Sequence, residues 1–139
     1  HEALVILKEE GLENSWARHQ YHHKALATGL EAMGLAFIVP EADRLPQLNA
    51  ATIPEGIDEA AVRKALLEQY NLEIGAGLGS LAGKVWRIGL MGFACNKKNV
   101  LLCLGALDSV LSQMGASIQT GIAVTAANQY YTQESLSRI

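Results

Sequence analysis

The residue with the clearest chemical potential is Arg87, which lies in the run Val85–Met91 just after a glycine-rich loop. Apolar and other side chains alternate along this run with a period of two. The pattern predicts a strand that carries Trp86, Ile88 and Leu90 on one face. Burial of that face turns Arg87 towards the opposite face. A guanidinium there can hold an anion through two parallel hydrogen bonds, so Arg87 is a candidate carboxylate-binding residue. The competing interpretation is an arginine that only solvates the sheet.

The loop itself, residues 75–84, is rich in glycine and invites comparison with phosphate-binding loops. A dinucleotide fingerprint needs glycine at the sixth position and a helix after it, whereas the chain has Ser80 there and a strand follows. A P-loop needs Ser or Thr after its lysine, where the chain has Val85. The remaining interpretation is a close-packed turn whose glycines allow a close approach of the backbone. The loop can then either pack against a partner domain or form part of the rim of a substrate site.

Three histidines, His19, His22 and His23, cluster within one predicted helix. Residues four apart share a helix face, which is the spacing of some metal ligands. No Cys, Asp or Glu occupies ligand spacing on the same face, and the paired-histidine enzyme motif also needs a glutamate between its histidines. We therefore expect no metal site. The apolar spacing of the helix predicts a packing seam of Leu12, Trp16, His19, His23, Leu26, Leu30 and Met33, in which two imidazoles are half-buried.

Hydrophobic periodicity and turn residues predict the elements that must position Arg87. Helices are expected over 2–10, 12–33, 58–70 and from Asn96 or Asn99 to 114, with a break at Gly11. Asp58 is the expected N-cap of the third helix, and Asn71 its expected left-handed C-cap. Strands are expected over 35–39, 48–53 and 85–91, with a short run ending at 74 and a possible edge strand at 118–124. Residues 130–135 look polar and irregular. This order predicts an α+β fold, with a small, mostly antiparallel sheet and helices packed on one face.

Composition narrows the class of protein. The chain has 139 residues, of which 50% are hydrophobic and 18% charged, which suits one folded domain. The net charge of −3 offers no basic stripe for nucleic acid, and no apolar run approaches the length of a membrane span. Two cysteines, Cys95 and Cys103, make no disulfide framework and favour a cytoplasmic setting. The chain starts at His1 inside a helical pattern, which we interpret as a C-terminal piece of a longer protein.

Three segments together resemble a known family. The run Glu73–Gly92 contains the pattern GLG-x3-GKV-x-RIG-x-xG, and the segments Leu12–His19 and Arg44–Gly56 precede it in the same order as in the family. These segments resemble the small C-terminal domain of the class V (fold type I) pyridoxal-phosphate aminotransferases, in their alanine–glyoxylate and serine–pyruvate branch. The resemblance covers residues 1–115. Residues 116–139 lie outside it, as an extension to which we assign no role.

The resemblance implies a function for the longer protein. It would move an amino group between a small amino acid, alanine or serine, and a 2-oxo acid, glyoxylate or pyruvate. The lysine, the acid and the phosphate ligands that hold pyridoxal 5'-phosphate would belong to a larger N-terminal domain, since no lysine here matches the cofactor segment. This chain would supply Arg87 to hold the substrate carboxylate, and the Gly77 loop to shape the rim. Ala76 departs from the glycine often found in the family.

The same resemblance sets expectations for partners and sites. The partners would be the chain's own large domain, a second subunit in a homodimer and the small acid substrates. No catalytic, cofactor-binding or metal-binding residue is expected in these 139 residues, so the piece alone should be inactive. The alternative is a stand-alone, non-catalytic ligand-binding or interaction domain, which the lack of a nucleophile–base pair favours. A domain encoded upstream would separate the two interpretations.

Overall fold

The computed structural model describes residues 1–136, which form α-helices and short strands. The elements, in chain order, are α1 (Glu2–Glu10), α2 (Leu12–Ala32), β1 (Leu48–Thr52), α3 (Glu59–Tyr70), β2 (Gly75–Ala76), β3 (Val85–Gly89), α4 (Lys97–Gln113) and α5 (Ala123–Leu136). Short 3-10 turns lie at Glu41–Asp43, Gly79–Leu81 and Gly92–Ala94. Within the described part, no helix combines the length and the apolar character that a bilayer crossing requires.

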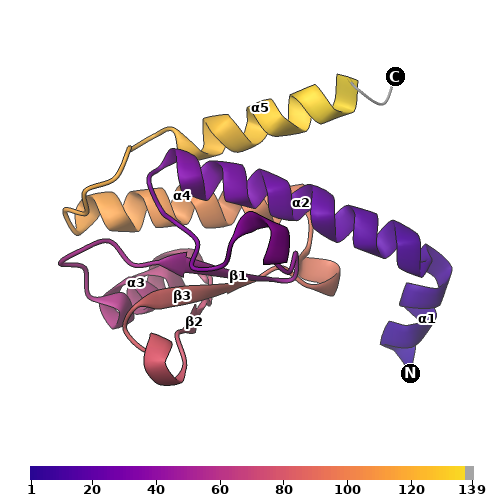
Figure 1. Cartoon of the computed structure of the whole chain (residues 1–139), viewed down its shortest axis with the longest axis horizontal. Coiled ribbons are helices and arrows are strands. Elements are labelled where there is room, and N and C mark those ends of the chain that lie inside the picture. The colour runs from indigo at the N-terminus through magenta and orange to yellow at the C-terminus, as the bar shows by residue number, and fades with distance from the viewer. Residues whose placement is uncertain (137–139) are drawn as a thin grey trace.

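The sheet has the strand order β1–β3–β2, so β3 is the central strand, and both pairings are antiparallel. Figure 1 shows α2 and α4 lying above the sheet and α5 above α2, while α1 projects from the far end of α2. The predicted α+β fold, with a small antiparallel sheet and helices packed on one face, is confirmed.

The core lies between the sheet and the helices. Trp86 and Ile88 of β3 are buried together with Leu30 of α2 and Leu104 of α4. Trp86 also donates from its indole Nε1 to the carbonyl of Glu59, at 3.4 Å. Each fully buried leucine stabilises the fold by about 1.5–3 kcal/mol relative to an exposed one. Burial of these side chains fixes which face of β3 points away from the helices.

Two helix ends form as the sequence predicts. The Asp58 carboxylate accepts hydrogen bonds from the backbone N–H groups of Ala60 and Ala61, at 2.9 and 3.1 Å, and so caps α3. Asn71 ends the same helix in the left-handed conformation, with φ of 51°. The seam predicted for α2 is correct from His19 onward and wrong before it, because Leu12 and Trp16 are exposed. Both side chains line an open groove between α1 and the first turns of α2.

The prediction for the C-terminal segment is wrong. Residues 118–122 form a turn instead of an edge strand, and α5 includes the stretch expected to be irregular. Its buried stripe consists of Ala123, Ala127 and Tyr131, spaced four apart, and it packs on α2. Tyr131 joins its hydroxyl to His22 Nδ1 at 2.8 Å. Two of these three residues are alanines, whose weak hydrophobicity hardly differs from that of their neighbours, so the sequence shows no clear helical periodicity here.

Two strands also differ from their predicted extents. The strand expected over 35–39 is reduced to a single antiparallel bridge between Phe37 and Ala51. The chain turns away after that bridge, and Arg44 donates from Nε to the carbonyl of Val39, at 3.0 Å. The short strand expected to end at Ile74 instead begins one residue later, as β2 (Gly75–Ala76), which pairs with β3. Glycine usually weakens a strand, but here its lack of a side chain leaves room over β3.

Candidate functional site

β3 places Arg87 on the face of the sheet that points away from the helices. Its neighbours Trp86 and Ile88 are 0% and 4% exposed on the opposite face, as the alternation predicts. Arg87 itself is half-buried. Val85 shares the face of Arg87 but is buried, since the loop that precedes β3 folds over it. The central strand therefore fixes a guanidinium on a mostly apolar face, and the cavity beside it is also lined by Asp43 and Arg44.

The residues that flank Arg87 on the neighbouring strands are small. Ala50 of β1 and Gly75 of β2 lie directly opposite it in the two ladders. A Cβ added at Gly75 would lie 3.3 Å from an Nη atom of Arg87, which is tighter than most such contacts. Sequence reasoning missed both flanking residues, because strand register between distant segments has no local signal. Together they leave open space beside the guanidinium.

The guanidinium is oriented by one hydrogen bond. Nε of Arg87 donates to the carbonyl oxygen of Ala76 at 2.7 Å. No carboxylate among residues 1–136 forms an ion pair with Arg87, so its four Nη hydrogens remain available. A cavity of about 250 Å³ adjoins it, with apolar walls that include Leu48, Leu81 and Val85. A guanidinium that is held in one orientation beside a mostly apolar cavity can bind a small carboxylate through two parallel hydrogen bonds.

Gly77 has a packing role in the same region. Its N–H donates to the carbonyl of Val85 at 3.0 Å, which closes the turn on β3. A Cβ at this position would lie 2.0 Å from the carbonyl oxygen of Leu81, so no side chain fits there. Gly77 is also buried. The structure thus accounts for glycine at this position through packing, and a contact between Gly77 and substrate stays a prediction.

The three histidines are held by protein groups. His19 Nδ1 donates to the carbonyl of Ser15 at 2.6 Å, and its Nε2 accepts from the N–H of Gly92 at 3.1 Å. His23 Nδ1 pairs with Asn49 Oδ1 at 2.7 Å. Burial lowers the pKa of both His22 and His23, which keeps them neutral near pH 7. Among the described residues, no group of three potential ligands is placed to hold a metal ion.

Neither cysteine is arranged as a nucleophile. Cys95 and Cys103 are free thiols, and both are buried. Burial raises the pKa of Cys103 to about 12, so its thiolate is scarce at neutral pH. Burial likewise raises the pKa of Cys95, although the nearby Arg18 opposes the shift. Cys103 is a small residue of the hydrophobic core.

The lysines do not form a site for pyridoxal phosphate. A lysine that holds this cofactor needs an enclosed position with an acid near the pyridine nitrogen. The chain's lysines are all exposed: Lys8, Lys24, Lys64, Lys84, Lys97 and Lys98. Lys64 is the one that pairs with an acid in the described part, through the helical neighbour Glu68 at 3.8 Å. The residues of this chain therefore do not fit the cofactor by themselves.

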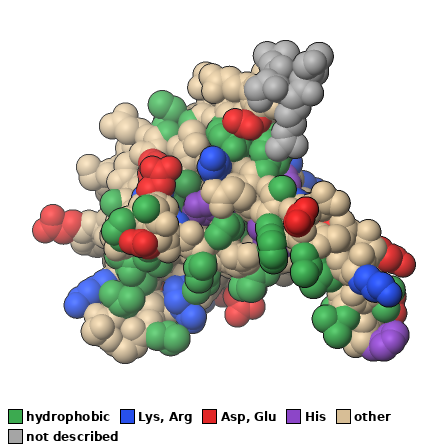
Figure 2. Space-filling view, turned by 45° about the vertical axis from the view of Figure 1, so that its right-hand side comes forward, with side chains coloured by type: hydrophobic (Ala, Val, Ile, Leu, Met, Phe, Trp, Pro, Cys, Tyr) green, Lys and Arg blue, Asp and Glu red, His purple; other side chains and the backbone are tan. Residues whose placement is uncertain are grey.

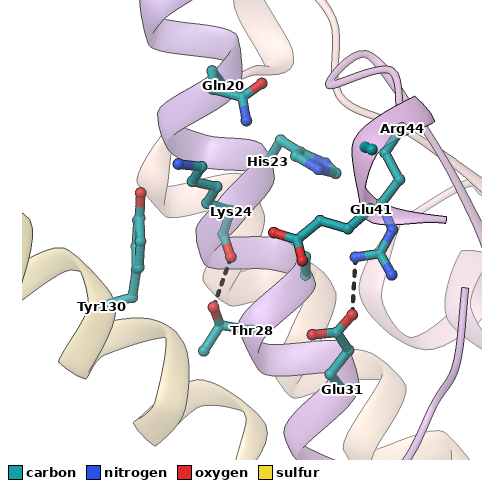
Figure 3. Close-up of a pocket in the computed structure, with 10 residues that line it drawn as sticks. Gln20, His23, Lys24, Thr28, Glu31, Glu41, Arg44 and Tyr130 are labelled. Carbon is teal, nitrogen blue, oxygen red and sulfur yellow. Dashed lines mark hydrogen bonds and ion pairs between the residues drawn. The ribbon is translucent and has the colours of Figure 1, made fainter.

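A more polar pocket runs along α2, and Arg44 lines both this pocket and the cavity beside Arg87 (Figure 3). Figure 3 shows His23 pointing towards Arg44, while Lys24 extends on the side of Tyr130. The guanidinium of Arg44 is already committed, because it pairs with Glu31 at 2.9 Å and lies 4.1 Å over the ring of Phe37. This pocket thus holds charges that neutralise one another, and Arg87 remains the stronger candidate for an anion site.

Comparison with known proteins supports a relationship to aminotransferases. No protein-family model matches the chain. It is 44% identical over 130 residues to the (S)-ureidoglycine–glyoxylate transaminase of Bacillus subtilis, a match that covers 94% of this chain and 31% of the relative. It is 35% identical over 142 residues to the serine–glyoxylate aminotransferase of Methylorubrum extorquens, covering 99% of this chain and 34% of that protein.

Solved structures agree with this relationship. The crystal structure of ureidoglycine–glyoxylate aminotransferase from Bacillus subtilis superposes with a TM-score of 0.89 at 44% identity, covering 92% of this chain and 33% of that one. These relatives and structural neighbours are class V aminotransferases. The chain matches their C-terminal part and spans about a third of their length.

Proposed function

We propose that this chain is the small C-terminal domain of an aminotransferase that acts on small 2-amino and 2-oxo acids. Glyoxylate is the acceptor that the relatives' names share, and alanine, serine and ureidoglycine are their donors. Within that range we favour alanine or serine as the donor and glyoxylate or pyruvate as the acceptor. The cavity beside Arg87 is small and apolar, which suits acids with short side chains.

The observation that carries this proposal is that the guanidinium of Arg87 forms no ion pair with any carboxylate of the described residues. Both the amino donor and the oxo acceptor bear a carboxylate attached directly to the reacting carbon. A guanidinium that grips this carboxylate at two points fixes the position of the reacting carbon. The hydrogen bond from Nε to Ala76 already orients the guanidinium, so little conformational entropy is lost on binding. Arg87 is therefore a substrate-binding residue that serves both halves of the reaction.

The rest of the site is supplied from outside these residues. A larger portion of an aminotransferase would bring the lysine that holds pyridoxal phosphate, because the lysines here are exposed and do not fit that role. The cofactor supplies the electron sink of the amino transfer when it is bound. We further propose a homodimer as the functional assembly and a reducing, cytoplasmic compartment, which suits the two free thiols Cys95 and Cys103.

A chimera tests the proposal. The matching third of the Bacillus subtilis transaminase is replaced by this chain, and the steady-state rates of the chimera are measured with Arg87, Arg87→Lys and Arg87→Ala. Hydrogen bonds to charged groups contribute about 1.5–3 kcal/mol each, so loss of the fork should lower kcat/KM by about 100-fold or more. The loss should appear for donor and acceptor alike, while cofactor content stays unchanged. Normal rates with both variants would show that Arg87 does not bind substrate and only solvates the sheet.

A further inference from the structure

A large apolar groove opens between α1, the first turns of α2 and the 3-10 turn Gly92–Ala94. Its volume is about 770 Å³. Large hydrophobic side chains line it without being covered, among them Ile6, Trp16, which is 60% exposed, and Phe93, which is 98% exposed. Figure 2 shows hydrophobic side chains on the body of the molecule facing the hollow beside the projecting N-terminal arm. Contiguous exposed apolar surface of this kind marks an interaction site.

Arg18 fixes the walls of this groove relative to one another. Its Nε and Nη2 atoms bind the two carboxylate oxygens of Glu10, at the end of α1. Its Nη1 donates to the carbonyls of Gly92 and Cys95, both at 2.9 Å. His19 adds a bond from the N–H of Gly92 to its Nε2, at 3.1 Å. One guanidinium thus joins all three walls, so the groove is preformed.

The arm that forms one wall lacks stability of its own. α1 has nine residues, and none of them is buried. Isolated helices shorter than about 12–15 residues are marginal in water. Gly11, with φ of 84°, bends the chain between α1 and α2 and directs the arm away from the body. Leu4 and Ile6 therefore face solvent in this chain. A second surface that packed against them would stabilise the helix and cover the groove.

We propose that this groove docks the larger, cofactor-binding portion of an aminotransferase, through an apolar segment that fills the space between α1 and Phe93 and covers Trp16. The relatives identify the occupant: this chain spans about a third of their length, so two thirds of such a protein remains to pack against it. The groove also includes Gly92, five residues along the chain from Arg87. Docking there brings the partner to the strand that carries Arg87. The identity of the partner rests on the proposed function.

The first test compares the stability of two proteins. Ile6→Asp and Phe93→Asp are made in the 139-residue chain and in the chimera with the Bacillus subtilis transaminase. Both side chains are exposed in the chain, so its thermal midpoint should shift by less than about 2 °C. In the chimera the same changes should lower the midpoint by about 5 °C or more, because a charge is placed in a buried interface.

Leu67→Asp is the matched control, since Leu67 is 48% exposed on α3 and lies outside the groove. It should leave both midpoints nearly unchanged. Groove variants that behave like Leu67→Asp in the chimera would overturn the proposal. The readout is a midpoint, so it is independent of substrate binding. If the Arg87 variants lose activity while the groove variants leave the midpoint of the chimera unchanged, the proposed function stands and this inference fails. If the Arg87 variants keep their activity while the groove variants lower the midpoint, the carboxylate role of Arg87 fails and the docking surface stands.

The two tryptophans supply a second measurement. Trp16 is exposed and Trp86 is 0% exposed, so quenching by acrylamide reports on Trp16, with Trp16→Phe as the blank. Trp16 should be quenched in the isolated chain and protected in the chimera. If the chimera does not fold, the isolated chain is titrated with the Bacillus subtilis transaminase that lacks its matching third. Saturable protection of Trp16 supports docking, and its absence contradicts it.

Sedimentation of the isolated chain tests a competing occupant, a second copy of the same chain. The proposal predicts that the chain is monomeric at micromolar concentration. Self-association that Phe93→Asp abolishes, and that leaves Trp16 protected without the transaminase portion, would show that the groove pairs with itself and would overturn the proposal.

Discussion

Replacing Gly77 by alanine should destabilise this chain strongly. The added Cβ would lie 2.0 Å from the carbonyl oxygen of Leu81 and 3.1 Å from a methyl group of Val85. The turn must move by about 1 Å before the first contact reaches the 3.0 Å that real Cβ atoms respect. That movement strains the bond from the N–H of Gly77 to Val85. Overpacking costs about 1–3 kcal/mol and a lost hydrogen bond about 1 kcal/mol, so we expect a loss of about 3 kcal/mol.

The assay is thermal and urea unfolding of the 139-residue chain. With an unfolding entropy of about 2.1 cal/mol/K per residue, a loss of 3 kcal/mol lowers the midpoint by about 10 °C. Gly79→Ala is the control in the same loop: Gly79 has φ of 56° but no atom within 4 Å of an added Cβ. It should cost about 1 kcal/mol from backbone strain alone. Equal losses for the two variants would refute the packing role assigned to Gly77.

Two further predictions concern helix packing and pH. Gly29→Ala should destabilise the chain by about 1–2 kcal/mol in urea unfolding, because its Cβ would lie 2.4 Å from a methyl of Leu104, whereas Gly105→Ala, with 3.7 Å of clearance, should stabilise it by about 0.5–1 kcal/mol. A stabilising Gly29→Ala would contradict the packing of α2 on α4. Burial lowers the pKa values of His22 and His23, so the unfolded state binds more protons below its pKa of about 6.5. The free energy of unfolding should therefore be level above pH 7 and fall as the pH drops from 6.5 to 5, and a flat profile in urea titrations would count against buried neutral imidazoles.

The sequence predicts the direction in which Arg87 points, because that direction depends on a local pattern. A period of two around Trp86 and Ile88 turns Arg87 outward, and one apolar face settles which way the strand packs. The cap at Asp58 and the left-handed residue Asn71 are likewise local, since each satisfies backbone groups a few positions away. Such features need no knowledge of the distant parts of the chain.

The features that the sequence could not predict depend on contacts between distant segments. Ala50 and Gly75 flank Arg87 only through the register of two ladders. The helix α5 is stabilised by Ala127 and Tyr131 against α2, and alanine gives weak periodic contrast. The exposure of Trp16 follows from the position of α1, which bends away at Gly11. Local pattern alone therefore assigned Trp16 to the buried seam.

The most direct test of the carboxylate role of Arg87 removes the carboxylate from the substrate. In the chimera with the Bacillus subtilis transaminase, single-turnover rates are measured from the absorbance of the bound cofactor, with L-alanine and with ethylamine, which is alanine without its carboxylate. If Arg87 binds the carboxylate, Arg87→Ala should lower the rate constant with alanine by about 100-fold or more and leave the slow reaction with ethylamine unchanged. Equal losses with alanine and ethylamine would contradict a carboxylate contact at Arg87.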